Sequence, residues 1–230
     1  MATAEPTPTA AEAVPPGRAA FHRARVYRTL AALYRAPEPR ALGHLKEAEL
    51  PALPEALAGL GAPPALVALA GQLLPVLAQE PPEELAREYD RLFEATGGLA
   101  CPPHETTLVA DTPQEGLTRT FRMADVAGFY RAFGVEMRPG TERPDHIAAE
   151  LEFAHLLSVK ELVALERGDG DEAVAVCRDA SRSFLRDHLH PFALRLAERI
   201  PQASARPPFS LAGRLLGGFV DFDARAIGAV

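Results

Sequence analysis

Apolar residues at helical spacing dominate the chain, and the pattern is clearest in the segment from Thr141 to Glu166. On one face, at 3.6 residues per turn, stand Ile147, Leu151, Ala154, Leu162 and Leu165. Because Pro144 disfavours helix at the residue before it and aspartate is a favoured N-cap, we expect Asp145 to cap this helix and His146 to be its first residue. The polar side chains of Glu142, Asp145 and His146 should then gather at a helix N-terminus, beside free amides.

Shorter segments of the same spacing fill most of the remaining chain, separated by proline and glycine. They predict three short helices between residues 40 and 80, and further helices at residues 19–34, 81–96, 121–133, 171–188, 191–200 and 207–230. Residues 97–118 show neither helical nor strand periodicity, and a loop of that length inside a compact domain is often functional. No segment alternates like a strand and no fixed repeat recurs, so the pattern predicts an all-α fold, a single-domain bundle of about ten helices.

Residues 1–18 differ from the rest, because alanine, proline, threonine and glutamate leave almost no large apolar side chain to bury there. Such a composition predicts a flexible leader before an all-helical domain at residues 19–230. The leader lacks the basic start and the apolar run of an export signal. No stretch of the chain approaches the roughly 18–20 apolar residues of a membrane helix, so we expect no stable membrane insertion.

Composition and charge narrow the partners. With 230 residues, of which 47% are hydrophobic, the chain can bury one substantial core. Its formal net charge of -7 makes nucleic acid an unsuitable partner and a basic peptide a suitable one. The two cysteines, Cys101 and Cys177, cannot form a disulfide framework, and free thiols are typical of a reducing compartment. We therefore expect a cytoplasmic location.

Candidate catalytic and metal-binding residues are few. Cys101 and His104 form one C-x-x-H pair, but structural zinc needs four ligands, and the other candidates are scattered: Cys177, His188 and His190. No glycine-rich loop carries the lysine of a phosphate-binding motif. Four residues could in principle support acid/base chemistry, although no nucleophile accompanies them: Glu142, Asp145, His146 and Glu150. The sequence therefore predicts neither an enzyme nor a resident metal or cofactor.

Four segments, in this order, resemble the TorD/DmsD/NarJ family of redox-enzyme maturation chaperones. The first two are Glu88-Tyr89-x-x-Leu92-Phe93 and the turn from Cys101 to Thr106, in which His104 stands where the family usually has an aromatic residue. The third runs from Ala124 to Gly134, and the fourth is the family signature, Glu142-x-Pro144-Asp145-His146 followed by Glu150, Leu151 and Phe153. With the later sequence FLRDHLHPF, they span residues 85–195, over half of the chain.

The resemblance implies an all-helical, cytoplasmic, system-specific chaperone of a DMSO-reductase-family molybdoenzyme. Such a chaperone binds the apoprotein and its twin-arginine signal peptide, and assists molybdenum cofactor insertion before export. The catalytic subunit and its leader would be the main partners, and proteins that deliver the molybdenum cofactor would be further ones. An acidic chain agrees with this, because it suits a peptide that carries two arginines.

Nine residues are expected to bind the peptide: Tyr89, Leu92, Phe93, Glu105, Phe129, Glu142, Pro144, Asp145 and His146. Glu105, Glu142 and Asp145 would receive arginine guanidinium groups, because the planar fork of arginine matches a carboxylate bidentately. The aromatic and leucine side chains would form the apolar wall of a groove beside these carboxylates.

Two alternatives stay open at this point. The first is a NarJ-like assembly factor that serves a membrane-bound nitrate reductase without an exported leader. The second, from a different class, is a small hydrolase that uses His146, Asp145 and Glu142 for acid/base chemistry. Co-purification of a large redox subunit would favour either kind of chaperone over the hydrolase.

Overall fold

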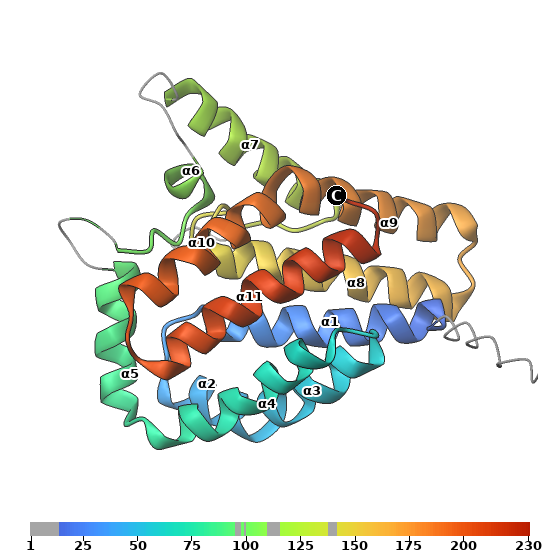
Figure 1. Ribbon diagram of the computed structural model, residues 1–230. Coiled ribbons are helices and arrows are strands. Elements are labelled where there is room, and N and C mark those ends of the chain that lie inside the picture. The colour runs from blue at the N-terminus through green and yellow to red at the C-terminus, as the bar shows by residue number, and fades with distance from the viewer. Residues whose placement is uncertain (1–13, 95–97, 99, 110–115, 138–141) are drawn as a thin grey trace, which may run out of the picture.

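The computed structural model describes residues 14–94, 98, 100–109, 116–137 and 142–230, and every regular element in these residues is a helix (Figure 1). In chain order the α-helices are α1 (Pro16–Leu33), α2 (Pro39–His44), α3 (Leu50–Gly59), α4 (Pro64–Gln79), α5 (Pro82–Tyr89), α6 (Glu105–Leu108), α7 (Gly116–Ala132), α8 (Ile147–Arg167), α9 (Asp171–Phe184), α10 (His190–Ala203) and α11 (Pro207–Ala226). Short π-helical turns continue three of them: η1 (Leu45–Glu49), η2 (Asp90–Glu94) and η4 (Leu185–Leu189). The predicted all-α class is confirmed.

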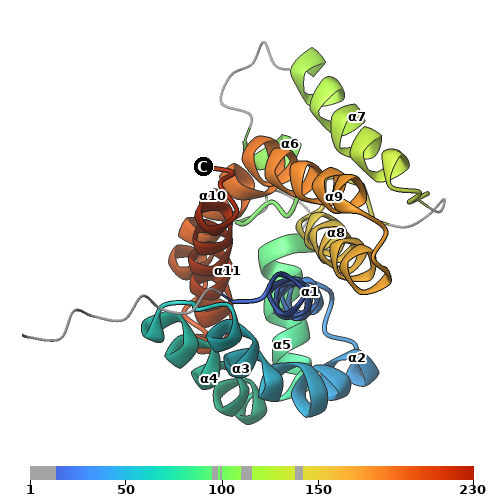
Figure 2. The ribbon, with the colours of Figure 1, turned by 90° about the vertical axis from the view of Figure 1, so that its right-hand side faces the viewer.

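Helices α1 and α8 pack side by side through the middle of the molecule (Figures 1 and 2). Leu30 of α1 and Leu151 and Leu157 of α8 are completely buried there. Each such leucine contributes roughly 1.5–3 kcal/mol by leaving water. The apolar face predicted from the sequence therefore holds α8 in the core.

A second contact of α1 is made with α11 through polar groups. Asp223 of α11 is 1% exposed and accepts hydrogen bonds from Tyr27 Oη at 2.7 Å and Arg23 Nε at 2.8 Å. The ring of Tyr27 also packs edge-on against Phe219. These contacts fix α1 between α8 on one side and α11 on another.

Helix α7 lies at the margin of the molecule (Figures 1 and 2). Its C-terminal half packs inward, where Tyr130 is 2% exposed and contacts Phe153. Farther toward the N-terminus of α7, Phe121 is 70% exposed. The helix is thus anchored by its C-terminal half and by the polar contacts of the site described below.

Several predicted boundaries are wrong. Helix α1 begins at Pro16 rather than Ala19, while residues 1–13 lie outside the described residues. Residues 97–118 were expected to be a loop, but they contain α6 and the first turn of α7. The predicted break after residue 188 is absent, because Pro191 sits in the first turn of α10, where a proline needs no amide partner.

The predicted start of α8 is shifted by one residue. His146, not Asp145, is the N-cap, and its Nδ1 accepts a hydrogen bond from the amide of Ala148 at 3.2 Å. Asp145 is unavailable as the cap because its carboxylate is bound to Arg143 and Thr106. Among the described residues, no helix is both long enough and apolar enough to span a bilayer.

Candidate functional site

The turn before α6 lies against the start of α8, so two segments far apart in the sequence meet. Their backbones form an isolated antiparallel bridge between His104 and His146. The amide of Glu105 donates to the carbonyl oxygen of Asp145 at 2.8 Å. The bridge brings the side chains of Glu105 and Asp145 into one buried polar cluster.

Asp145 is completely buried in this cluster. Arg143 donates from Nε to Oδ1 at 3.0 Å and from Nη2 to Oδ2 at 2.8 Å. Thr106 donates to Oδ2 from its hydroxyl at 2.6 Å and from its amide at 3.3 Å, which caps the first turn of α6. Asp145 was expected to bind an arginine of a peptide. In the structure it binds Arg143 of the chain itself.

Glu105 is likewise completely buried and internally paired. Arg122 of α7 donates from Nη1 to its Oε1, and His188 Nδ1 lies 3.2 Å from its Oε2. A buried carboxylate needs such partners because its desolvation is otherwise costly. Neither Glu105 nor Asp145 presents its carboxylate to solvent, contrary to expectation.

Glu150 differs from these two acids. It is completely buried, and neither of its carboxyl oxygens has a hydrogen-bond partner among the described residues. Burial raises the pKa of Glu150 well above its ordinary value, and the charges of Glu105 and Asp145 raise it further. Burial therefore favours the protonated, uncharged form of Glu150.

The expected apolar wall belongs to the core. Tyr89, Leu92 and Phe93 are at most 4% exposed, and Tyr89 donates its hydroxyl to the carbonyl oxygen of Tyr34 at 3.2 Å. Phe129 is half-buried and packs edge-on against other rings of the core. Spacings of three and four residues place side chains on one helix face, and here that face turns inward. None of these four residues lines the open groove described next, and their binding of a peptide stays a prediction.

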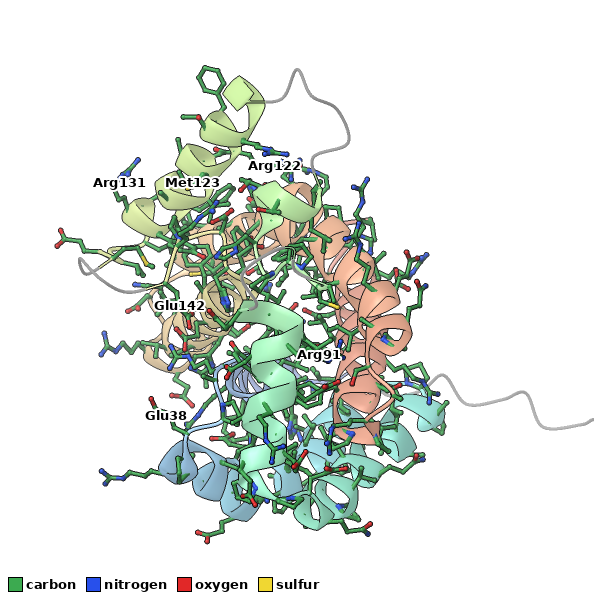
Figure 3. All side chains as sticks on the ribbon, turned by 90° about the vertical axis from the view of Figure 1, so that its left-hand side faces the viewer. Glu38, Arg91, Arg122, Met123, Arg131 and Glu142 are labelled. Atoms are coloured by element: carbon green, nitrogen blue, oxygen red, sulfur yellow. The ribbon has the colours of Figure 1, made fainter. Side chains whose placement is uncertain are left out.

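An open groove does exist elsewhere, between α1, the α2–η1 segment and α8, with a volume of about 1120 Å³. Its apolar lining includes Ala31, Ala32, Leu45, Phe153 and Leu156. Its carboxylates are Glu49, Glu136, Glu142 and Glu152. Of the nine residues expected to bind a peptide, Glu142 alone lines this groove, and it lies on the face between α7 and α2 (Figure 3).

Glu142 is one of two groove carboxylates, the other being Glu136, that have no arginine partner among the described residues. Its side chain is 45% exposed, and its Oε2 lies 3.3 Å from His146 Nδ1. Burial lowers the pKa of His146 to about 4, so the ring is neutral at neutral pH. Because the same Nδ1 accepts a hydrogen bond from Ala148, it offers Glu142 no proton. Among the described residues, Glu142 has no cationic partner at neutral pH.

Two other carboxylates of the groove hold arginines of the chain. Arg28 Nη2 lies 2.8 Å from Glu49 Oε1, and Arg35 Nη2 lies 2.5 Å from Glu152 Oε1. Burial raises the pKa of Glu152, and the like charge of Glu142 raises it further, while Arg35 opposes both effects. Glu142 and Glu152 are therefore close enough to repel each other.

A small apolar pocket of about 50 Å³ adjoins the groove. The two hollows share part of their lining: Ala32, Arg35, Ala41 and Leu45. The pocket itself is walled by leucines from α4 and α5, by Phe209 and by Tyr89. Tyr89 thus contributes to a hollow beside the groove, whereas Leu92 and Phe93 line neither of these two hollows.

The requirements of a metal site and of a reactive thiol can be compared with the residues that the structure describes. Among the residues that the structure describes, no group of three histidine, cysteine or acidic side chains could hold a metal ion. Cys101 is completely buried, and burial raises the pKa of its thiol to about 11. Its amide donates to the carbonyl oxygen of Leu92 at 3.0 Å, which attaches the turn to η2.

Comparisons with known proteins agree with this fold. A solved structure of a protein from Archaeoglobus fulgidus, described as a redox enzyme maturation protein, aligns with a TM-score of 0.54 at 16% identity. The alignment covers 86% of this chain and 93% of that chain. The family model of the nitrate reductase delta subunit matches residues 61–198, more than half of the chain. No curated protein matches the chain.

The fold is thus that of a helical redox enzyme maturation protein. The chain belongs to the nitrate reductase delta subunit family, the family of NarJ/TorD-type chaperones. The resemblance carried by the four sequence segments is confirmed.

Proposed function

We propose that this protein is a cytoplasmic chaperone that binds the twin-arginine signal peptide and apoprotein of a DMSO-reductase-family molybdoenzyme, and assists molybdenum cofactor insertion before export. Membership of the NarJ/TorD-type family supports the class of function. The open acidic groove supports the kind of ligand, since carboxylates on an apolar surface suit a peptide that carries both arginine and apolar side chains.

The observation that carries the proposal is Glu142 at the groove. Its carboxylate is exposed, and neutral His146 leaves its charge uncompensated. An arginine of a peptide would form a charge-assisted, bidentate contact with it. The apolar pocket beside Arg35 would take an apolar side chain of the same peptide.

The other residues of the signature support Glu142 rather than touch the peptide. The carbonyl oxygen of Pro144 accepts a hydrogen bond from Tyr130 Oη at 2.7 Å. Asp145 is held by Arg143 and Thr106. His146 caps α8. These contacts fix the backbone immediately after Glu142, so Pro144, Asp145 and His146 position the exposed carboxylate of Glu142.

A second candidate function follows from the description of the matching family model, the nitrate reductase delta subunit. It favours an assembly factor for a membrane-bound nitrate reductase, which would bind its client without an exported leader. The hydrolase alternative gains no such support, because Asp145 and His146 are buried and internally bound. Identification of the co-purified subunit by mass spectrometry separates the two assembly functions.

Isothermal titration with a synthetic peptide, in which two adjacent arginines precede an apolar segment, tests the groove. We expect binding to the unmodified protein, and an affinity lower by roughly tenfold for Glu142→Gln, because the amide cannot form a charge-assisted contact. A peptide with two glutamines in place of the arginines should bind weakly, and with equal affinity, to the unmodified protein and to Glu142→Gln.

Glu166→Gln is the matched control, since Glu166 is an exposed glutamate near the other end of α8. It removes the same charge but should leave the affinity unchanged. If Glu142→Gln and Glu166→Gln lost equal affinity for the peptide, the loss would reflect the net charge of the protein and not a contact at Glu142. If the unmodified protein did not bind the peptide, the proposed ligand would be wrong.

A further inference from the structure

The chain binds its own arginines at carboxylates of the kind proposed for the peptide. Arg143 occupies Asp145, Arg28 occupies Glu49 and Arg35 occupies Glu152. The pair at Asp145 is part of the buried polar cluster, because the acid is completely buried and both of its carboxylate oxygens accept hydrogen bonds from Arg143. The pairs at Glu49 and Glu152 line the open groove instead.

Arg35 occupies a special place in that groove. It lies two residues after the last residue of α1, and its side chain is 53% exposed. It lines both the groove and the adjoining apolar pocket, so it stands where the two hollows meet. A peptide that used both hollows would have to pass this side chain.

The carboxylates around Arg35 outnumber it. Glu142 and Glu152 interact with each other, and Arg35 is the cation that interacts with Glu152. The remaining arginine of the groove, Arg28, is bound to Glu49. Glu142 and Glu152 together carry two negative charges, and Arg35 compensates one of them. A second guanidinium group can therefore bind at Glu142, and Arg35 can be replaced at Glu152.

Building on the proposed function, we infer that Arg35 is a built-in competitor that occupies Glu152 in the free protein and is displaced by an arginine of the incoming peptide. One peptide arginine takes Glu142 and the other takes Glu152, while Arg35 turns outward into solvent. Each guanidinium group of the peptide then has one carboxylate, and Arg35 has none.

Breaking the Arg35–Glu152 ion pair requires little free energy, because both of its side chains are partly exposed to solvent. The Arg35 side chain is 53% exposed and the Glu152 side chain is 45% exposed. Exposed ion pairs contribute little to stability, since water solvates the separated ions well. The contact therefore excludes weakly cationic peptides from Glu152 without closing the site to a strongly binding one.

Removal of Arg35 should strengthen peptide binding, which is the opposite of the usual effect of removing a residue from a binding site. For Arg35→Ala we expect an affinity for the two-arginine peptide about threefold to fivefold higher, the size expected for an exposed ion pair. Arg28→Ala is the matched control, because Arg28 is 56% exposed, lines the same groove and pairs with a different glutamate. It should change the affinity less than twofold.

A double-mutant cycle separates competition from a general change of charge. In the Glu152→Gln background, Arg35 has no carboxylate to block, so Arg35→Ala should no longer raise the affinity. Equal gains for Arg28→Ala and Arg35→Ala, a gain that persists in the Glu152→Gln background, or a loss of affinity for Arg35→Ala would each overturn the inference. Absence of binding by the unmodified protein would refute the proposed function itself, and circular dichroism at each step verifies that the variants are folded.

Discussion

His146 combines two properties that a surface histidine does not have. Its Nδ1 accepts the hydrogen bond that caps α8, and its side chain is 4% exposed. Only the neutral ring has a lone pair at Nδ1, so protonation would break the cap as well as bury a charge. Burial lowers the pKa of His146 from 6.5 to about 4; the negative charge of Asp145 opposes this shift, and the positive charge of Arg35 adds to it.

We therefore predict that protonation of His146 lowers the free energy of unfolding in mild acid. In the unfolded chain its pKa is near 6.5, whereas in the folded chain it is near 4, so the stabilisation is complete above pH 6.5 and is lost as the pH falls to 4. His146→Asn keeps a good N-cap without the titration. Urea unfolding at pH 7 and pH 4.5 should show the variant losing about 2–3 kcal/mol less than the unmodified protein between these pH values.

His44→Asn serves as the control for this experiment, because the side chain of His44 is 58% exposed. It should follow the pH dependence of the unmodified protein. An identical acid response of the His146→Asn variant would show that His146 does not control it.

The signature illustrates what residues alone reveal. Glu142, Pro144, Asp145 and His146 could be identified from the sequence, since their order is specific and a helix start was visible. Their roles could not be predicted, because these depend on which side chains are buried. Asp145 is hydrogen-bonded to Arg143 and Thr106, and of the four residues only Glu142 lines the groove. Arg35, just after α1, carried no sequence signal, since charged residues around helices usually face solvent.

At the scale of elements, two side-chain contacts hold the exposed half of α7 in position. Arg122 binds Glu105, and His188 Nε2 lies 3.2 Å from Asp125 Oδ2. Arg122 also donates from Nη1 to the carbonyl oxygen of Asp187 at 3.3 Å. These groups connect α7 with α6 and with η4.

Arg122→Ala should therefore loosen α7 and destabilise the fold. It removes the guanidinium partner of a completely buried carboxylate, a change that costs about 3–5 kcal/mol when no substitute is present. Since His188 still contacts Glu105, we expect a loss of about 2–3 kcal/mol. Hydrogen exchange in residues 119–125 should become faster than in α8, and urea unfolding measures the loss. Arg119→Ala, an exposed change on the same helix, should affect neither.

Helix existence was predictable from apolar spacing, but helix continuity was not. The chain from Asp171 to Ala203 continues from α9 through η4 into α10, although Pro191 suggested a break. A proline ends a helix when an amide partner is needed, and in the first turn of α10 none is. The short α6 lacks an apolar repeat of its own, and its first turn is capped by Asp145 from a distant segment. Such tertiary capping leaves no local pattern.

At the scale of the whole molecule, α1 has two faces with separate tasks. One face carries Arg23 and Tyr27, which bind Asp223 of α11. The other carries Arg28, Ala31 and Ala32, which line the groove. We therefore expect that stability and the proposed peptide binding can be changed independently on a single helix.

Asp223→Ala tests this division. It leaves the buried hydroxyl of Tyr27 without its acceptor and removes one of two acidic partners of Arg23, the other being Glu161. Because breaking a buried ionic network costs about 3–5 kcal/mol, we expect a loss of that order in urea unfolding. Affinity for the two-arginine peptide, measured well below the unfolding transition, should stay within twofold of the unmodified protein. Asp221→Ala, on the same helix but 35% exposed, removes partly exposed contacts with His190 and Arg225, so it should cost only about 1 kcal/mol and leave the affinity unchanged. A parallel loss of affinity in Asp223→Ala would mean that the groove depends on the whole packing of α1 against α11, and not on its outer face alone.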